Sequence, residues 1–110
     1  MRLCDPREFR RIKEQGLRRV AGCMIANWLP LPEGSGSQLG IITGRRMGAS
    51  VERNRARRLL REAFRLHQHD LARPVALVLI ARRSIVEQNG PAVAGNLLRI
   101  LNQAGLLRRP

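Results

Sequence analysis

The chain has few cysteines, few aromatic residues and no long apolar run, and these shortages exclude several classes of protein. Cys4 and Cys23 are its only cysteines, too few for a disulfide framework or a zinc site, so we expect two reduced thiols. No apolar run reaches the roughly 18–20 residues that span a bilayer, and residues 1–10 lack the apolar core of a signal peptide. The sequence therefore predicts a cytoplasmic protein with no membrane contact.

Acidic residues are also few, which argues against catalysis by the protein itself. A hydrolase that works through protein side chains needs paired acids or a nucleophile beside a base. The eight acids are scattered and form no convincing pair: Asp5, Glu8, Glu14, Glu33, Glu52, Glu62, Asp70 and Glu87. His67 and His69 lack a third metal ligand, and His67 is better interpreted as a partly buried residue. We expect no catalytic residue and no metal site in the protein.

Arginine is what the chain has in abundance. Its 21 Lys+Arg against 8 Asp+Glu give a net charge of +13, and Lys13 is the only lysine. A domain this basic is usually built to meet phosphate, in nucleic acid or at a membrane surface. At 110 residues and 44% hydrophobic content, the chain fits one small domain over residues 1–110 with a modest core.

The charge concentrates on one predicted helix, for which Ser50 is the expected N-cap. Residues 45–65 hold eight arginines and two glutamates, a net 8 − 2 = +6. On a helical wheel the apolar side carries Ala56, Leu59, Leu60, Ala63 and His67. The other side carries Asn54, Arg57, Arg58, Arg61 and Arg65. Because like charges repel, a polyanionic partner, RNA or DNA, is the simplest reason for this arrangement.

Helix and strand patterns alternate along the chain. The predicted elements are a helix over 5–16, strands over 20–29 and 39–43 that pair with each other, the arginine helix to about residue 69, a buried central strand over 75–81, and a helix from 89 to 105. Residues 30–38, rich in proline, glycine and serine, predict a flexible loop. The order α-β-β-α-β-α predicts an α+β fold, a two-layer α/β sandwich with helices packed on a small mixed sheet.

Residues 39–65 resemble a long motif of the protein subunit of bacterial ribonuclease P. That family has a strand ending in a basic pair, a glycine turn, and an Arg-Asn-Arg helix that continues into Arg-Glu-x-Phe-Arg. Those features correspond here to Arg45-Arg46, Gly48, Arg53-Asn54-Arg55 and Arg61-Glu62-Ala63-Phe64-Arg65. Glu8-Phe9 with Gly16 resembles its first helix, and Ile80-Ala81-Arg82 its later strand, so the resemblance covers nearly the whole chain.

The resemblance implies a fold and a function. The fold would have a left-handed crossover around the Arg-Asn-Arg helix, like the second domain of a small-subunit ribosomal protein, although most parallel crossovers are right-handed. The function would be that of an endoribonuclease subunit, in an enzyme that removes the 5′ leader of precursor tRNA. Catalysis would belong to a large RNA that positions Mg²⁺. The protein would bind that RNA and the leader, raise the affinity for substrate and Mg²⁺, and need no obligate protein partner.

The resemblance also implies two sets of site residues. Those expected to bind the catalytic RNA are Arg45, Arg46, Arg53, Asn54, Arg55, Arg58 and Arg65. Those expected to bind the leader in a central cleft are Phe9, Asn54, Arg57 and Arg61. The family's cleft usually carries several aromatics, but other residues occupy such positions here: Lys13, Met24, Ala26 and Asn27. We therefore expect leader binding to depend more on charge than on stacking.

Two other interpretations fit a basic domain of this size. One is a structural RNA-binding protein such as a ribosomal protein, which would not stimulate RNA-catalysed cleavage of precursor tRNA. The other is a DNA-binding regulator, which would need side chains that read bases and usually a dimer. The arginine helix suits phosphates better than one base sequence, and a preference for structured RNA over duplex DNA would exclude the regulator.

Overall fold

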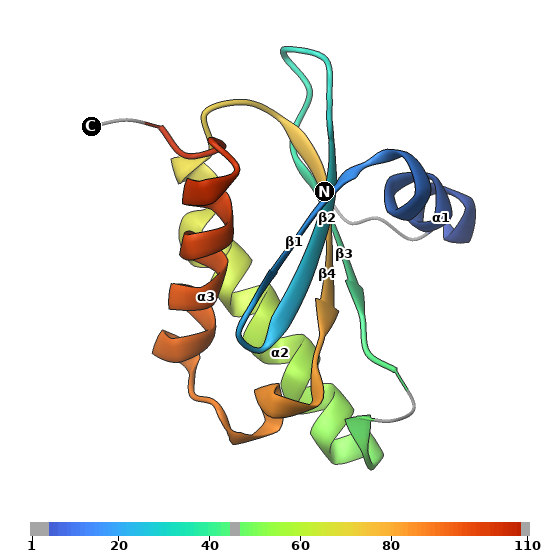
Figure 1. Cartoon of the computed structure of the whole chain (residues 1–110), viewed down its shortest axis with the longest axis vertical. Coiled ribbons are helices and arrows are strands. Elements are labelled where there is room, and N and C mark those ends of the chain that lie inside the picture. Colours follow the sequence, from blue (N-terminus) through green and yellow to red (C-terminus); the bar gives the residue numbers. More distant parts are fainter. Residues whose placement is uncertain (1–4, 45–46, 109–110) are drawn as a thin grey trace.

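The computed structural model describes residues 5–44 and 47–108. Its elements, in chain order, are α1 (Pro6–Gln15), β1 (Leu17–Ala21), β2 (Met24–Pro30), β3 (Gln38–Ile42), α2 (Ser50–His67), the 3₁₀ helix η2 (Gln68–Asp70), β4 (Val75–Ala81), the 3₁₀ helix η3 (Arg83–Glu87) and α3 (Gly90–Gln103). Figure 1 shows the helices arranged on both sides of one sheet. The predicted α+β fold class is confirmed.

The sheet has the strand order β1-β2-β4-β3. β2 is antiparallel to both of its neighbours, whereas β3 runs parallel to β4. β4 lies between two other strands and is buried along almost its whole length, as its continuous apolar run predicts.

The prediction of a single strand over 20–29 was wrong. The chain reverses at Gly22, whose φ of 53° lies in the left-handed region that glycine tolerates, and the two halves pair as the hairpin β1–β2. Because β2 takes β1 and β4 as its neighbours, β3 cannot pair with it and joins β4 instead. The apolar residues on both sides of Gly22 conceal this turn in the sequence.

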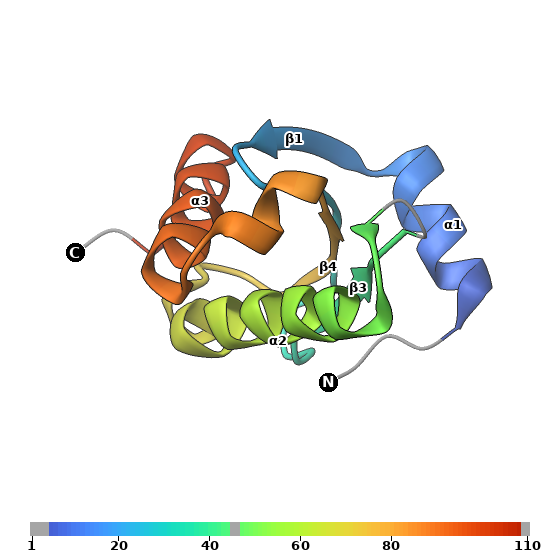
Figure 2. The ribbon, with the colours of Figure 1, turned by 90° about the horizontal axis from the view of Figure 1, so that it is seen from below.

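The helices form two unequal layers around the sheet. α2 and α3 cover one face and enclose the main core, while α1 lies alone on the other face (Figure 2). A smaller cluster under α1 joins Ile12 to Ala76 and Val78 of β4, with Phe9 packed against its edge. Successive side chains of a strand point to opposite faces, so β4 supplies both clusters.

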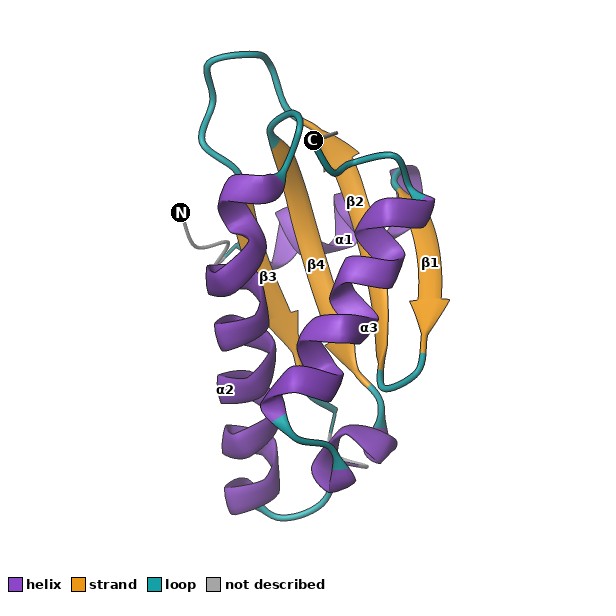
Figure 3. Ribbon diagram, turned by 90° about the vertical axis from the view of Figure 1, so that its left-hand side faces the viewer, coloured by secondary structure: helices purple, strands orange, loops and turns teal. Residues whose placement is uncertain are grey.

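The crossover from β3 through α2 to β4 is left-handed, as the resemblance implies. In Figure 3 the helices α2 and α3 lie toward the viewer, both strands run downward, and β4 lies to the right of β3. With the strands turned to run upward, β4 falls on the left of β3 and the helix still faces the viewer. A right-handed crossover would place β4 on the right.

Local side-chain caps mark the starts of two helices. The Asp5 carboxylate accepts a hydrogen bond from the amide of Arg7 at 2.9 Å and so caps α1, and Asn89 caps α3 through the amide of Ala92 at 2.9 Å. Glu8, three residues after this cap, does not complete a capping box, because its carboxylate accepts from Arg11 at 3.3 Å.

The start of α2 differs from its prediction. Ser50 is the first helical residue, and Ala49 is the N-cap without a side-chain hydrogen bond. The turn before it reverses at Gly48, whose φ is 119°, and the Glu52 carboxylate folds over Gly48 in the space a Cβ would need. A residue with a side chain cannot take the place of Gly48 without moving Glu52, so this glycine fixes how α2 begins.

The loop between β2 and β3 is held at its two ends. The amide of Leu31 donates to the carbonyl of Pro74 at 3.0 Å, and the amide of Val75 donates to the Ser37 hydroxyl at 3.1 Å. The flexibility predicted for residues 30–38 stays a prediction.

Cys23 is a buried free thiol beneath α3. Its Sγ accepts a hydrogen bond from Nδ2 of Asn96 at 3.3 Å. Burial raises the pKa of the Cys23 thiol, which disfavours the reactive thiolate. Cys4 lies outside the described residues.

Candidate nucleic-acid interface

The buried side of α2 fixes where its other side chains point. Ala56, Leu60, Ala63 and Phe64 are buried against the main core, and Leu59 packs partly against it. The predicted helix phase is therefore confirmed, and Phe64 is an addition that the sequence reasoning missed. Its position four residues after Leu60 was the available signal, since residues four apart share one side of a helix.

The opposite side of α2 forms a surface that we call the arginine face. It consists of Asn54, Arg57, Arg58, Arg61 and Arg65, which are exposed except for the half-buried Arg57. Nη1 of Arg57 donates to Oδ1 of Asn54 at 3.1 Å, so the Asn54 amide orients that guanidinium along the helix surface. The predicted clustering of these five side chains is consistent with the helix phase seen in the structure.

In the part of the chain that the structure describes, Glu62 is the one acid that bonds to a side chain of the arginine face. Glu62 accepts two hydrogen bonds from Arg65, and this contact with Arg65 lowers the pKa of the Glu62 carboxyl. The pair is exposed, and exposed ion pairs contribute little to stability, so a phosphate can compete for Arg65. Arg58 and Arg61 have no ion pair within residues 5–44 and 47–108, and their charges remain open to an anionic partner.

Two arginines of the Arg-Asn-Arg motif lie apart from the arginine face. Nη2 of Arg53 donates to the Ser50 hydroxyl at 3.2 Å in the first turn of α2. Nη2 of Arg55 donates to the backbone carbonyl of Gln88 at 2.9 Å, on the flank of α2 that faces η3. The structure therefore does not bring Arg55 together with Arg58 and Arg65.

Phe9 stands in a different place from the rest of the predicted leader set. Its half-buried ring lies over Gly40 of β3, so close that a Cβ at Gly40 would collide with it. α1 covers the face of the sheet opposite α2 (Figure 2). Asn54, Arg57 and Arg61 belong to the arginine face of α2. Phe9 has a packing role that its sequence position alone did not reveal.

The strand register shows on which face of the sheet the positions lie where the family usually has aromatics. Met24 and Ala26 belong to the main core, so an aromatic there would fill the core beneath α2 and α3. Trp28 is buried in the same core. Asn27 lies on the α1 face and is the one buried polar residue in the described part of the chain. Among the four positions, only Lys13 and Asn27 lie on the side of the sheet that α1 covers.

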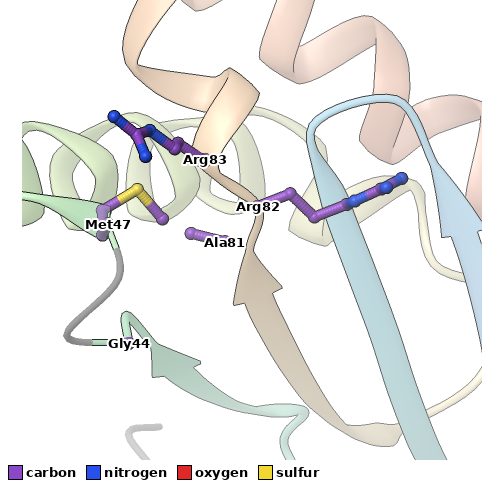
Figure 4. A pocket seen from close by; sticks show the side chains of 5 residues that line it. All are labelled: Gly44, Met47, Ala81, Arg82 and Arg83. Atoms are coloured by element: carbon purple, nitrogen blue, oxygen red, sulfur yellow. The ribbon is translucent and has the colours of Figure 1, made fainter.

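A cavity of about 390 Å³ lies at the edge of the sheet where β3 and β4 both end. Its lining is formed by Gly44, Met47, Ala81, Arg82 and Arg83 (Figure 4). Arg82 points away from Met47, and its Nη1 donates to the carbonyl of Gly22 at 3.3 Å, while Arg83 lies on the Met47 side. Among the described residues, the lining of the cavity thus includes two arginines and no acid.

Arg82 and Arg83 are not among the site residues expected from the sequence. The signal that could have placed them was the parallel pairing of β3 with β4, in which Ile42 lies beside Ile80. Parallel strands end at the same edge of a sheet, so the residues that follow them come together there. Arg45 and Arg46, which follow β3, lie outside the described residues.

The described residues form no metal-binding cluster and no membrane-spanning helix. Within residues 5–44 and 47–108, no three His, Cys, Asp or Glu side chains are grouped so that they could hold a metal ion. The Nδ1 of His67 lies 3.2 Å from Oδ2 of Asp70, which leaves this histidine with a carboxylate neighbour. No helix in the described part is long and apolar enough to cross a membrane.

Comparison with known protein families identifies the family of this chain. The model of the family described as ribonuclease P matches residues 1–105. The chain belongs to the ribonuclease P protein family. The ribonuclease P protein component of Chloroflexus aggregans is 36% identical over 110 residues, covering 99% of this chain and 81% of the relative. That of Desulfatibacillum aliphaticivorans is 35% identical over 96 residues, covering 87% and 80%.

Solved structures of ribonuclease P proteins share the fold. The Thermotoga maritima protein matches with a TM-score of 0.80 and 26% identity, over 94% of this chain and 96% of that one. A mutant Staphylococcus aureus protein matches with a TM-score of 0.86 over 96% and 89%, and its 23% identity supports the fold alone. The chain is therefore a subunit of the ribonuclease P ribonucleoprotein, an endoribonuclease of tRNA processing, and its partner is the ribonuclease P RNA.

Proposed function

We propose that the arginine face of α2 holds the phosphates of the ribonuclease P RNA and of the precursor-tRNA 5′ leader. The observation that carries this proposal is the exposure of Arg58 and Arg61 on the same side as Arg65, with Glu62 as the only acid among them. Such a row repels itself in the free protein, and RNA phosphates relieve that repulsion while releasing their counterions. Catalysis belongs to the RNA in this proposal, and no protein residue acts as acid, base or nucleophile.

Within this interface the residues have different roles. Arg58 and Arg65, together with Arg53, contact the catalytic RNA, to which Arg45 and Arg46 add further contacts. Arg57 and Arg61 contact the leader, and Asn54 supports them because its amide oxygen already accepts from Arg57. The contacts address phosphates, so they fit leaders of varied sequence.

Mg²⁺ enters this function through the RNA. The described residues offer no group of carboxylates, histidines or thiols that fits a metal ion, so no step is assigned to a protein-bound metal. Positive charge on the arginine face lowers the repulsion between two RNA chains, and less Mg²⁺ is then needed to hold the leader beside the catalytic RNA.

The site of action in this proposal is the cytoplasm, where precursor tRNA is processed.

The test is cleavage of precursor tRNA by a bacterial ribonuclease P RNA at low Mg²⁺, with and without this chain. We expect strong stimulation by the wild-type chain and loss of stimulation in the double variant Arg53→Ala plus Arg57→Ala. The matched control is Arg10→Ala plus Arg99→Ala, which removes the same charge from α1 and α3 and should keep most of the stimulation. Tight RNA binding without stimulation by the wild-type chain would instead favour a structural RNA-binding protein.

Leader binding is tested separately from RNA binding. The holoenzyme is titrated with precursor tRNA and with the same tRNA lacking its leader, and the ratio of the two affinities gives the leader contribution. Arg61→Met should shrink that ratio, most clearly at low salt. A ratio that stays high in salt and collapses only in Phe9→Ala would mean that stacking, and not charge, holds the leader.

A further inference from the structure

Arg55 is bound inside the protein, unlike the other arginines of the middle of α2. Its Nη2 donates to the carbonyl of Gln88 at 2.9 Å, a contact between residues 33 apart in the sequence. Its Nη1 is buried and has no hydrogen-bond partner within the described ranges. A bidentate phosphate contact uses two guanidinium nitrogens at once, and here one terminal nitrogen is occupied and the other is shut away from solvent.

The position of Arg55 around the helix also keeps it away from a phosphate on the arginine face. At 100° per residue it lies about 100° around the helix from the middle of the arginine face, on the flank directed toward η3. Arg58 and Arg61, by contrast, are exposed on the arginine face. RNA lying along that face would approach Arg58 and Arg61 and would meet Arg55 only from its side.

Gln88 stands at the junction between η3 and α3, where Ile85 and Val93 pack in the same core as α2. It follows η3, and its amide donates back to the carbonyl of Ile85 at 3.0 Å, while the next residue, Asn89, caps α3. η3 also begins with Arg83, which lines the cavity beside Met47 just ahead of α2. The bond from Arg55 to Gln88 therefore adds a polar tie from α2 to the point where the segment that carries Arg83 meets the start of α3.

We propose that Arg55 positions the junction between η3 and α3 against α2 and is not a phosphate ligand. This inference rests on the proposed RNA-binding function, because it takes Arg55 out of the set of residues expected to bind the catalytic RNA. A hydrogen bond from a guanidinium to a backbone carbonyl is charge-assisted and stronger than a neutral one. Losing it leaves the Gln88 carbonyl without this donor and lets the junction move.

Two variants and one control test the proposal. Arg55→Met keeps the length of the side chain and removes its donors, and Arg58→Met is the control from the exposed row. We expect Arg55→Met to lower the melting temperature by several degrees and to leave unchanged the slope of log affinity for ribonuclease P RNA against log salt, measured well below that temperature. Arg58→Met should keep the melting temperature and reduce the slope by about one.

Amide hydrogen exchange shows which part of the protein loosens when Arg55 is replaced. In Arg55→Met, amide exchange should accelerate over residues 83–93 and stay unchanged in the buried strand β4. Arg55→Lys retains a single donor and should restore part of the melting temperature and of the protection at 83–93. This variant also keeps the test informative if Arg55→Met folds poorly.

The contrary result is a reduced salt slope in Arg55→Met with an unchanged melting temperature and unchanged exchange, which would return Arg55 to the RNA-binding set. Failure of the broader function is distinguishable from this. In that case Arg58→Met would leave the salt slope as it is, whereas the melting temperature and exchange of Arg55→Met would still decide the role of Arg55.

Discussion

Helices α2 and α3 lie side by side on the same face of the sheet, and they show very different surfaces to solvent. Both bury apolar side chains in the main core, with Leu60 from α2 and Leu97 from α3 fully buried. α2 contains six arginines and two glutamates, a net 6 − 2 = +4, whereas α3 contains the single charged residue Arg99.

The difference separates two demands on a helix. Covering this sheet requires a buried apolar side, and α3 shows that no row of charges is needed for it. The arginine face of α2 therefore cannot be explained by packing. We propose that it serves the RNA partner, which membership of the ribonuclease P protein family supplies.

The largest expected effect tests whether the buried sides of the two helices are equivalent. Leu60→Ala and Leu97→Ala should each lower the free energy of unfolding by about 2–5 kcal/mol, because each leaves a cavity in the main core. Urea unfolding measures both variants. If Leu60→Ala alone leaves the free energy of unfolding unchanged, the side of α2 assigned to the core is wrong. The comparison of α2 with α3 would then have no basis.

A smaller effect should distinguish the exposed sides. Arg61→Met on α2 should reduce the slope of log affinity against log salt for binding of precursor tRNA by the holoenzyme by about one, since one leader phosphate contact is lost. Arg99→Met on α3 removes the same charge and should change the slope much less. Equal losses in the two variants would mean that overall charge, and not the position of the arginines, governs binding.

The smallest effect concerns stability alone. Gly95 is exposed within α3, and a Cβ placed there meets no atom within 4 Å. Gly95→Ala should raise the free energy of unfolding by about 0.5–1 kcal/mol, because alanine favours the helix and glycine does not. Its affinity for RNA should equal that of the wild type, as expected if the exposed side of α3 does not contact the RNA. A weaker affinity would bring α3 into the interface.

Much of this arrangement was predictable because it depends on local patterns. The apolar run 75–81 marked the central strand, Asp5 and Asn89 marked helix starts, and the spacing of Ala56, Leu60 and Ala63 gave the phase of α2. Each of these signals lies within a few residues of the structure it determines. The handedness of the crossover came from the family resemblance and not from any local rule.

The parts that were missed depend on contacts distant in the sequence. The β1–β2 hairpin is marked only by Gly22 within an otherwise apolar stretch, and the pairing of β3 with β4 follows from it. Arg55 looks like its neighbours in the sequence, but its carbonyl partner at Gln88 comes from another element. Phe9 likewise could not be placed over Gly40 without knowing which strand lies beneath α1.

The most direct test of the central claim is the salt dependence of binding to ribonuclease P RNA in two double variants of equal charge. One is Arg58→Met plus Arg65→Met on the arginine face, and the other is Arg10→Met plus Arg99→Met on α1 and α3. The arginine-face variant should reduce the slope of log affinity against log salt by about two, with an unchanged melting temperature, while the control stays near the wild-type slope. Equal slopes in the two variants would contradict the assignment of the arginine face as the RNA interface.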